Sequence, residues 1–116
     1  MKRTVRLHAD YECYPVWIVS DQGLDNVSPD SLPLSGQLAE ELDRWGDEYE
    51  ATYNREDPIA SGFTSESAEQ SFNQQGKSLA RRLRDELDET WCVSYFDRAT
   101  ASHVAIERLQ GSDNDY

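Results

Sequence analysis

The sequence has 116 residues and a formal net charge of −12, from 23 acidic and 11 basic residues. This length suits one hydrophobic core, so we expect a single α+β domain over residues 1–110 and a mobile acidic tail at 111–116. Such a charge repels nucleic-acid phosphates and anionic membrane surfaces, and it attracts basic proteins. Direct binding to nucleic acid or membrane is therefore disfavoured, although an acidic surface also serves solubility alone.

Residues 1–30 contain no apolar segment of the signal-peptide type, and the chain has no run of 18 apolar residues. We therefore expect a soluble, cytoplasmic protein. Its two cysteines, Cys13 and Cys92, form no CxxC pair, and in that compartment both thiols are expected to be reduced. Their separation in sequence leaves open whether they meet in the fold.

The first part of the chain predicts two strands. Residues 3–9 alternate apolar and polar side chains, which is the period of a strand with one buried face. Residues 14–20 are apolar on both parities, which favours a central strand. The connection at 10–13 is short enough to close a hairpin, whereas the turn-forming residues of 21–35 predict a surface loop.

An amphipathic helix is predicted from Ser35, its N-cap, to Tyr53. Its apolar stripe consists of Leu38, Leu42, Trp45, Tyr49 and Tyr53, at helical spacing. Its polar face carries Glu40, Glu41, Asp43, Asp47, Glu48 and Glu50 against the single Arg44. Residues 40–57 hold eight acids and two bases, a net charge of −6. Gly46, inside this helix, indicates that another element approaches closely.

A second amphipathic helix is predicted over residues 65–89, and basic side chains in its middle complement the acidic helix. The simplest use of these charges is an antiparallel helix pair. Residues 90–97 return to strand alternation, and 102–109 favour a closing strand. The predicted fold is α+β, a small, mainly antiparallel sheet in ββααββ order with two helices packed on one face.

No motif marks a catalytic or cofactor site. The soft metal ligands are His8, Cys13, Cys92 and His103, and their spacing matches no zinc signature. No G-x-S-x-G sequence occurs, and no acidic pair is marked by a glycine-rich turn or a histidine partner. We therefore assign no catalytic residue, no metal and no cofactor.

Tyr11 and Tyr14 lie in the first connection, beside Asp10 and Glu12, where their rings are less easily buried. Tyrosine offers contact area at a small entropic cost, and carboxylates bind lysine and arginine, so this combination suits a protein interface. The competing interpretation is that the aromatic rings cap the end of the sheet.

Several short segments carry a resemblance to known proteins. They are Pro15-Val16-Trp17, Leu32-Pro33-Leu34-Ser35, Trp45 with Tyr49, Asp57-Pro58 and Ser61-Gly62-Phe63. With the size and acidity of the chain, they resemble a group of small acidic uncharacterised bacterial proteins and the immunity proteins of bacterial toxin systems. The resemblance implies that the protein neutralises a toxin by binding it tightly. The toxin is often a basic nuclease, whose active site the acidic surface would cover.

The leading hypothesis is a non-enzymatic immunity or inhibitor protein that binds a basic protein partner such as a toxin nuclease. Charge and expected exposure select its partner-binding residues, which are Asp10, Tyr11, Glu12, Glu40, Asp43, Asp47 and Glu50. Two alternatives stay open. One is a small enzyme or ligand-binding domain with a pocket between helices and sheet, and the other is a structural or regulatory homodimer. The sequence does not decide between monomer and homodimer.

Overall fold

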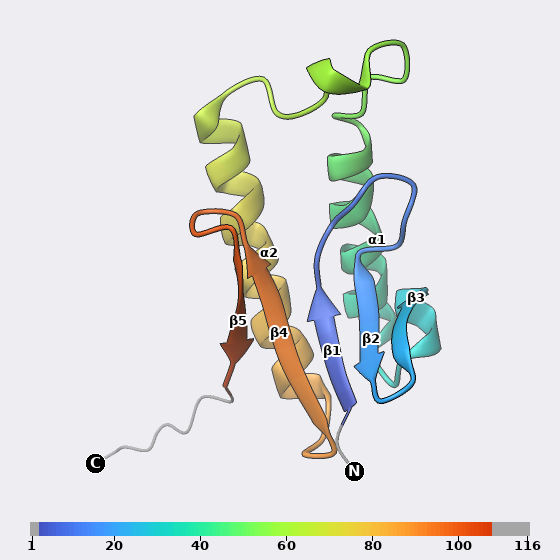
Figure 1. Cartoon of the computed structure of the whole chain (residues 1–116). Helices are drawn as coiled ribbons and strands as arrows, with labels where there is room; N and C mark the ends of the chain where they lie inside the picture. The colour runs from blue at the N-terminus through green and yellow to red at the C-terminus, as the bar shows by residue number, and fades with distance from the viewer. Residues whose placement is uncertain (1–2, 108–116) are drawn as a thin grey trace, which may run out of the picture.

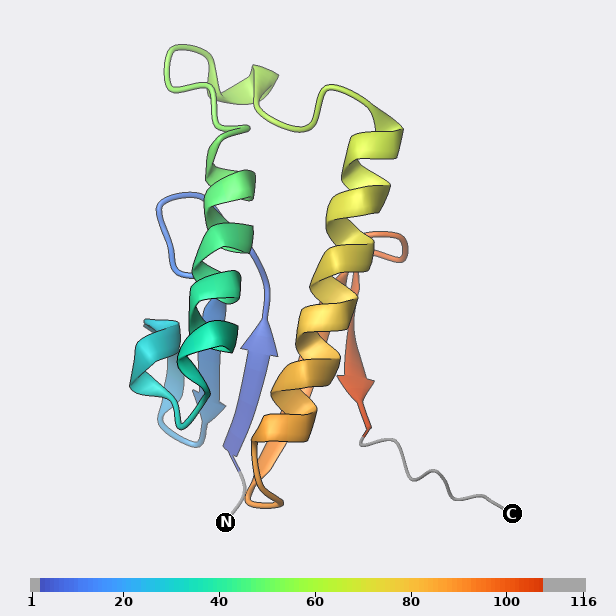
Figure 2. The same ribbon diagram turned by 180° about the vertical axis from the view of Figure 1, so that it is seen from behind.

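The computed structural model describes residues 3–107, so the expected tail at 111–116 lies outside the described residues. Five strands form one sheet, and two α-helices lie on the same face of it (Figures 1 and 2). The elements in chain order are β1 (Arg3–Leu7), β2 (Val16–Ser20), β3 (Gly23–Val27), α1 (Gly36–Glu50), α2 (Glu66–Glu86), β4 (Trp91–Asp97) and β5 (Ser102–Ile106). Two short 3-10 turns, η1 (Pro29–Ser31) and η2 (Pro58–Ala60), precede the helices.

The sheet has the strand order β3-β2-β1-β4-β5. Every neighbouring pair is antiparallel except β1 and β4, which run parallel with Val5 opposite Val93. A parallel pair needs a crossover, and here the crossover contains both helices. The predicted α+β class, mainly antiparallel sheet and one-sided helix layer are confirmed.

The prediction of a continuous surface loop over 21–35 is wrong, because residues 23–27 form the edge strand β3. Gly23 has a φ of +122°, a conformation that glycine adopts readily, and it follows the turn that reverses the chain after β2. Most of β3 is solvent-exposed, so no buried face leaves an alternating pattern in its sequence. Backbone pairing with β2 makes this strand, and the order becomes βββααββ.

Helix α1 begins where it was predicted, since the Ser35 hydroxyl accepts the Leu38 N–H at 3.1 Å. It ends at Glu50, three residues before the predicted end at Tyr53. The chain leaves the helix there because the Thr52 carbonyl accepts the Gly62 N–H at 3.0 Å, which ties the end of α1 to the following loop.

Helix α2 has Ser65 as its N-cap, as predicted, but it ends at Glu86 and not at residue 89. The reason is the buried Arg84 side chain. Its guanidinium donates hydrogen bonds to the carbonyls of Trp91 and Asp88, both at 2.7 Å, and so it holds the chain in the turn that leads into β4.

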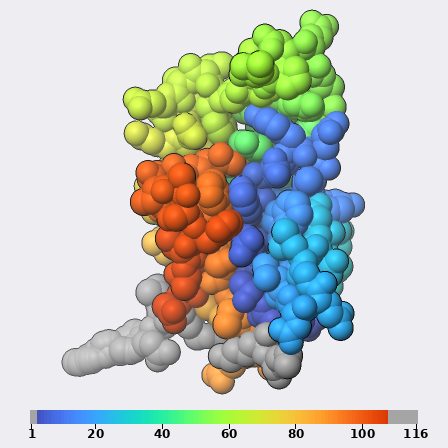
Figure 3. Space-filling model, viewed as in Figure 1, coloured from blue at the N-terminus to red at the C-terminus, as the bar shows by residue number. Residues whose placement is uncertain are grey.

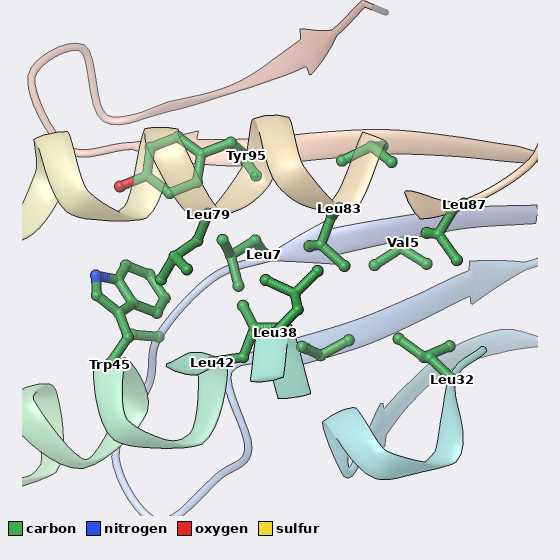
Figure 4. Close-up of a cluster of buried hydrophobic side chains, with 14 of the residues drawn as sticks. Val5, Leu7, Leu32, Leu38, Leu42, Trp45, Leu79, Leu83, Leu87 and Tyr95 are labelled. Atoms are coloured by element: carbon green, nitrogen blue, oxygen red, sulfur yellow. The ribbon is translucent and has the colours of Figure 1, made fainter. Parts of the chain in front are cut away.

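The core lies between the helices and the sheet, where side chains from α1, α2, β1 and β4 point toward one another (Figure 4). The Trp45 ring stacks on Phe72 with centroids 4.4 Å apart, and its indole N–H donates to the Phe72 carbonyl at 3.0 Å. The Tyr95 hydroxyl donates to Asn73, so both large aromatic residues satisfy their polar atoms inside the core. Gly76 is the point on α2 where these two rings pack against the helix backbone.

Complementary charges join the helices, as the sequence indicated. Arg82 of α2 pairs with Glu41 of α1 at 2.7 Å, and both side chains are partly buried. Neither of the two α-helices in residues 3–107 has the length and apolar composition of a membrane span.

Candidate functional site

The β1–β2 connection lies against the C-terminal half of α1, where a stack of tyrosines holds it. The Tyr11 ring stacks on Tyr49 and on Tyr53, with centroid separations of 4.5 and 4.6 Å. Its hydroxyl is hydrogen-bonded to the Thr52 hydroxyl at 2.6 Å. The connection is therefore fixed on the helix by aromatic contact and a hydrogen bond.

An exposed arginine ties three segments together at the same place. The Arg55 guanidinium contacts Glu12 at 2.8 Å and Glu50 at 2.9 Å. The second oxygen of the Glu50 carboxylate accepts the Glu12 backbone N–H at 2.7 Å. The β1–β2 connection, the end of α1 and the loop after α1 thus share one network of charge-assisted hydrogen bonds.

Between this connection and α1 lies a groove of about 670 Å³, which we call the acidic groove. It is lined by Glu12, Cys13, Tyr14, Pro15, Asn26, Asp43, Gly46, Asp47 and Glu50. Gly46 explains how the two elements come so close, because a Cβ built there would lie 3.0 Å from the Pro15 ring. The close approach expected at Gly46 is confirmed.

The groove is strongly negative. Burial and the neighbouring Asp30 and Asp47 raise the pKa of the Asp43 carboxyl above its ordinary value. Burial, Asp10, Glu12 and Glu50 raise the pKa of the Cys13 thiol. Within residues 3–107, no lysine or arginine forms an ion pair with Asp43 or Asp47. The groove can therefore accept a cation from outside the chain.

The sequence of this chain is similar to that of a known protein family. A family model described as Serratia CdiI immunity protein-like matches residues 3–98. The chain belongs to this immunity protein-like family. The resemblance to immunity proteins of bacterial toxin systems is thereby confirmed, and membership suggests a toxin inhibitor that is not an enzyme. No curated protein matches the chain.

In this CdiI immunity protein-like chain, the fold brings most of the predicted partner-binding residues together. Glu12, Asp43, Asp47 and Glu50 line the acidic groove, although they come from segments 31 or more residues apart. Tyr11 lies beside it and is half-buried by its stacking partners.

Two predicted residues lie outside the lining of the groove. The Asp10 carboxylate accepts the Tyr11 backbone N–H at 2.8 Å, so it shapes the connection. Glu40 lies toward the start of α1, where it faces Arg44 at 3.9 Å with both side chains mostly exposed.

Three residues of this surface of the immunity protein-like fold were not predicted as part of an interface, namely Cys13, Asn26 and Arg55. Cys13 and Asn26 line the groove together with Tyr14, and Arg55 contacts two of its lining residues, Glu12 and Glu50. Asn26 lies on the missed strand β3, where its side chain bonds both the N–H and the carbonyl of Tyr14. One feature of the sequence indicated Arg55, namely that it is a basic residue within an otherwise acidic segment.

The opposite face of the sheet carries a separate ring cluster. His8 stacks on Phe96 with centroids 4.2 Å apart, and His103 lies edge-on at 5.5 Å from His8. Burial and the nearby His103 lower the pKa of His8 to about 4. Across residues 3–107 no three His, Cys, Asp or Glu side chains gather in a way that could hold a metal ion, and Cys13 and Cys92 are both free thiols.

Proposed function

We propose that this chain neutralises a toxin domain by binding it through the acidic groove and the acidic face of α1. The observation that carries the proposal is the pair Asp43 and Asp47, which line the groove without a cationic partner among residues 3–107. Burial and repulsion by the carboxylates of Asp30 and Asp47 raise the pKa of Asp43, so ionised Asp43 costs the folded protein free energy. A lysine or arginine from a partner would relieve that repulsion, which favours binding as the reason for the cluster.

A basic toxin nuclease fits this role best. Enzymes that bind nucleic acid carry positive surfaces that meet phosphates, and an acidic protein can cover such a surface. The net charge of −12 would also speed the encounter at low salt through long-range attraction. Two exposed free thiols suit a reducing compartment, so we place the encounter in the cytoplasm.

The test begins by capturing the partner from the native host at low salt and identifying it by mass spectrometry. The partner is then purified, and its affinity for wild type and for Asp43→Lys/Asp47→Lys is measured by calorimetry at two salt concentrations. We expect the double variant to bind at least roughly tenfold more weakly at low salt and to show a smaller salt dependence.

The matched control is Asp85→Lys/Glu89→Lys, which makes the same change of net charge at two exposed positions, one in the last turn of α2 and one in the turn that follows it. This control variant should keep most of the affinity for the partner, because salt at moderate concentration screens charges that lie far from the interface. Equal binding by wild type and the groove variant would refute the proposal.

A further inference from the structure

Loop 54–62, which joins the two helices, has a backbone fixed by its own hydrogen bonds. The Asn54 side-chain oxygen accepts the backbone N–H groups of Glu56 and Asp57, both at 3.0 Å. The Asn54 N–H in turn donates to the Ser61 hydroxyl at 2.7 Å. A loop bonded in this way holds its outward side chains in fixed directions, which lowers the entropic cost of using them in binding.

At the tip of this loop stands Ile59, whose side chain is 96% exposed. The other large exposed apolar residues within residues 3–107, Tyr14 and Leu24, are 50% and 52% exposed. A single exposed aliphatic side chain is ordinary on protein surfaces. Ile59 differs because the turn at Pro58–Ala60 is made by backbone hydrogen bonds, so folding needs no apolar side chain at its middle position.

Ile59 and the acidic groove belong to the same end of the molecule. Arg55, four residues before Ile59, bonds both Glu12 and Glu50 of the groove. Figure 3 shows the loop (green) directly above the β1–β2 connection (blue). One partner could therefore contact the groove and the loop at the same time.

We infer that Ile59 is the apolar anchor of the toxin contact, an inference that rests on the proposed function. The partner it fits is a basic protein with a small apolar pocket bordered by lysine or arginine side chains. Those cations would meet the exposed Glu56 and Asp57, which come shortly before Ile59 in the loop, and the carboxylates of the groove. An apolar anchor within a polar rim is the usual arrangement of the residues that dominate protein interfaces.

The test uses the captured and purified partner with Ile59→Ser, Ile59→Val and the control Leu24→Ser, which removes an exposed apolar side chain from the edge strand β3. Ile59→Ser should weaken binding about 10- to 100-fold, the range implied by burial of an isoleucine side chain. This loss should persist at high salt, because it is not electrostatic. Ile59→Val, which removes one methylene group, should bind within about fivefold of wild type. Leu24→Ser should bind like wild type, because Leu24 lies on β3 and does not line the acidic groove.

The outcomes separate this inference from the function on which it rests. Ile59→Ser at wild-type affinity, with Asp43→Lys/Asp47→Lys still weakened, would overturn the anchor and leave the groove in place. A wild-type protein that captures no basic partner would overturn both. Thermal unfolding of Ile59→Ser should match that of wild type, because the side chain is 96% exposed, so weaker binding cannot be attributed to misfolding.

Discussion

Replacement of Gly76 by alanine should destabilise this protein, although alanine is the better helix former. A Cβ at this position would lie 2.5 Å from the Trp45 ring and 2.8 Å from Cε1 of Tyr95. Atoms in contact need about 3.5 Å, so α2 or the two rings must shift by roughly 1 Å. Trp45 donates a hydrogen bond to Phe72, and Tyr95 donates to Asn73, and both bonds anchor the rings to α2 itself.

The magnitude follows from three contributions. Overpacking of a core costs about 1–3 kcal/mol. Each buried hydrogen bond that the shift breaks costs about 1 kcal/mol, and one or two are at risk. Because alanine is favoured over glycine in a helix interior, the substitution also contributes about 1 kcal/mol of stabilisation, which offsets part of these two costs. The free energy of unfolding should therefore fall by about 1–4 kcal/mol.

Urea unfolding followed by tryptophan fluorescence measures this change. With an m value of about 1.5 kcal/mol per molar, the midpoint should fall by roughly 1–3 M. Gly36→Ala is the matched control, because Gly36 is the first residue of α1 and a Cβ there meets nothing within 4 Å. A midpoint for Gly76→Ala at or above that of wild type would refute the packing argument.

Three further predictions concern charge. Hydrogen bonds from Asn73 and other donors lower the pKa of Asp97. The ionised carboxylate therefore stabilises the fold fully above about pH 4, and this stabilisation is lost as the pH falls through the pKa of the folded state. The free energy of unfolding of Asp97→Asn should depend less on pH in this acid range. His8, with a pKa of about 4, resists protonation in the fold, so stability should decline as the pH falls from 6.5 toward 4, and NMR titration of the ring should show the low midpoint. Arg55→Gln should change the unfolding free energy by less than about 1 kcal/mol, because the ion pairs are exposed, and should speed association with a basic partner in stopped-flow experiments at low salt.

Each of these has a contradicting result. An unchanged acid dependence in Asp97→Asn would mean that the carboxylate does not stabilise the fold through its charge. A His8 midpoint near 6.5 would place the ring in solvent. Slower association of Arg55→Gln would mean that the main role of Arg55 is to hold the binding surface in place, and that its neutralisation of the Glu12 and Glu50 charges matters less.

Apolar periodicity predicted both helices and four of the five strands, because each of these elements buries at least part of one face. β3 was not predicted, because neither of its faces is buried. Its side chains are largely exposed, and its pairing with β2 uses backbone groups that leave no trace in the pattern of residue types. The helix ends were misplaced because Thr52 and Arg84 act through tertiary hydrogen bonds to backbone atoms.

The candidate site was predictable in part. Charge density identified the acidic helix, and Gly46 indicated a close neighbour, but nothing in the sequence identified Pro15 as that neighbour. The association of Arg55 with Glu12 and Glu50 depends on how three separate segments meet, which no local spacing encodes. Ile59 drew no attention, because only its exposure in the fold distinguishes it from a core residue.

The parallel pairing of β1 with β4 has a consequence for the moment of synthesis. β1 leaves the ribosome before β2 to β5, yet its parallel neighbour β4 comes 88 residues later, as the pairing of Val5 with Val93 shows. At about 5–20 residues per second, the nascent chain waits roughly 5–20 s with one edge of its central strand unpaired. During this interval the β1–β2–β3 meander can pair with foreign strands. The complete sheet, with the helix layer packed on it, therefore forms only when β4 has been made and has paired with β1.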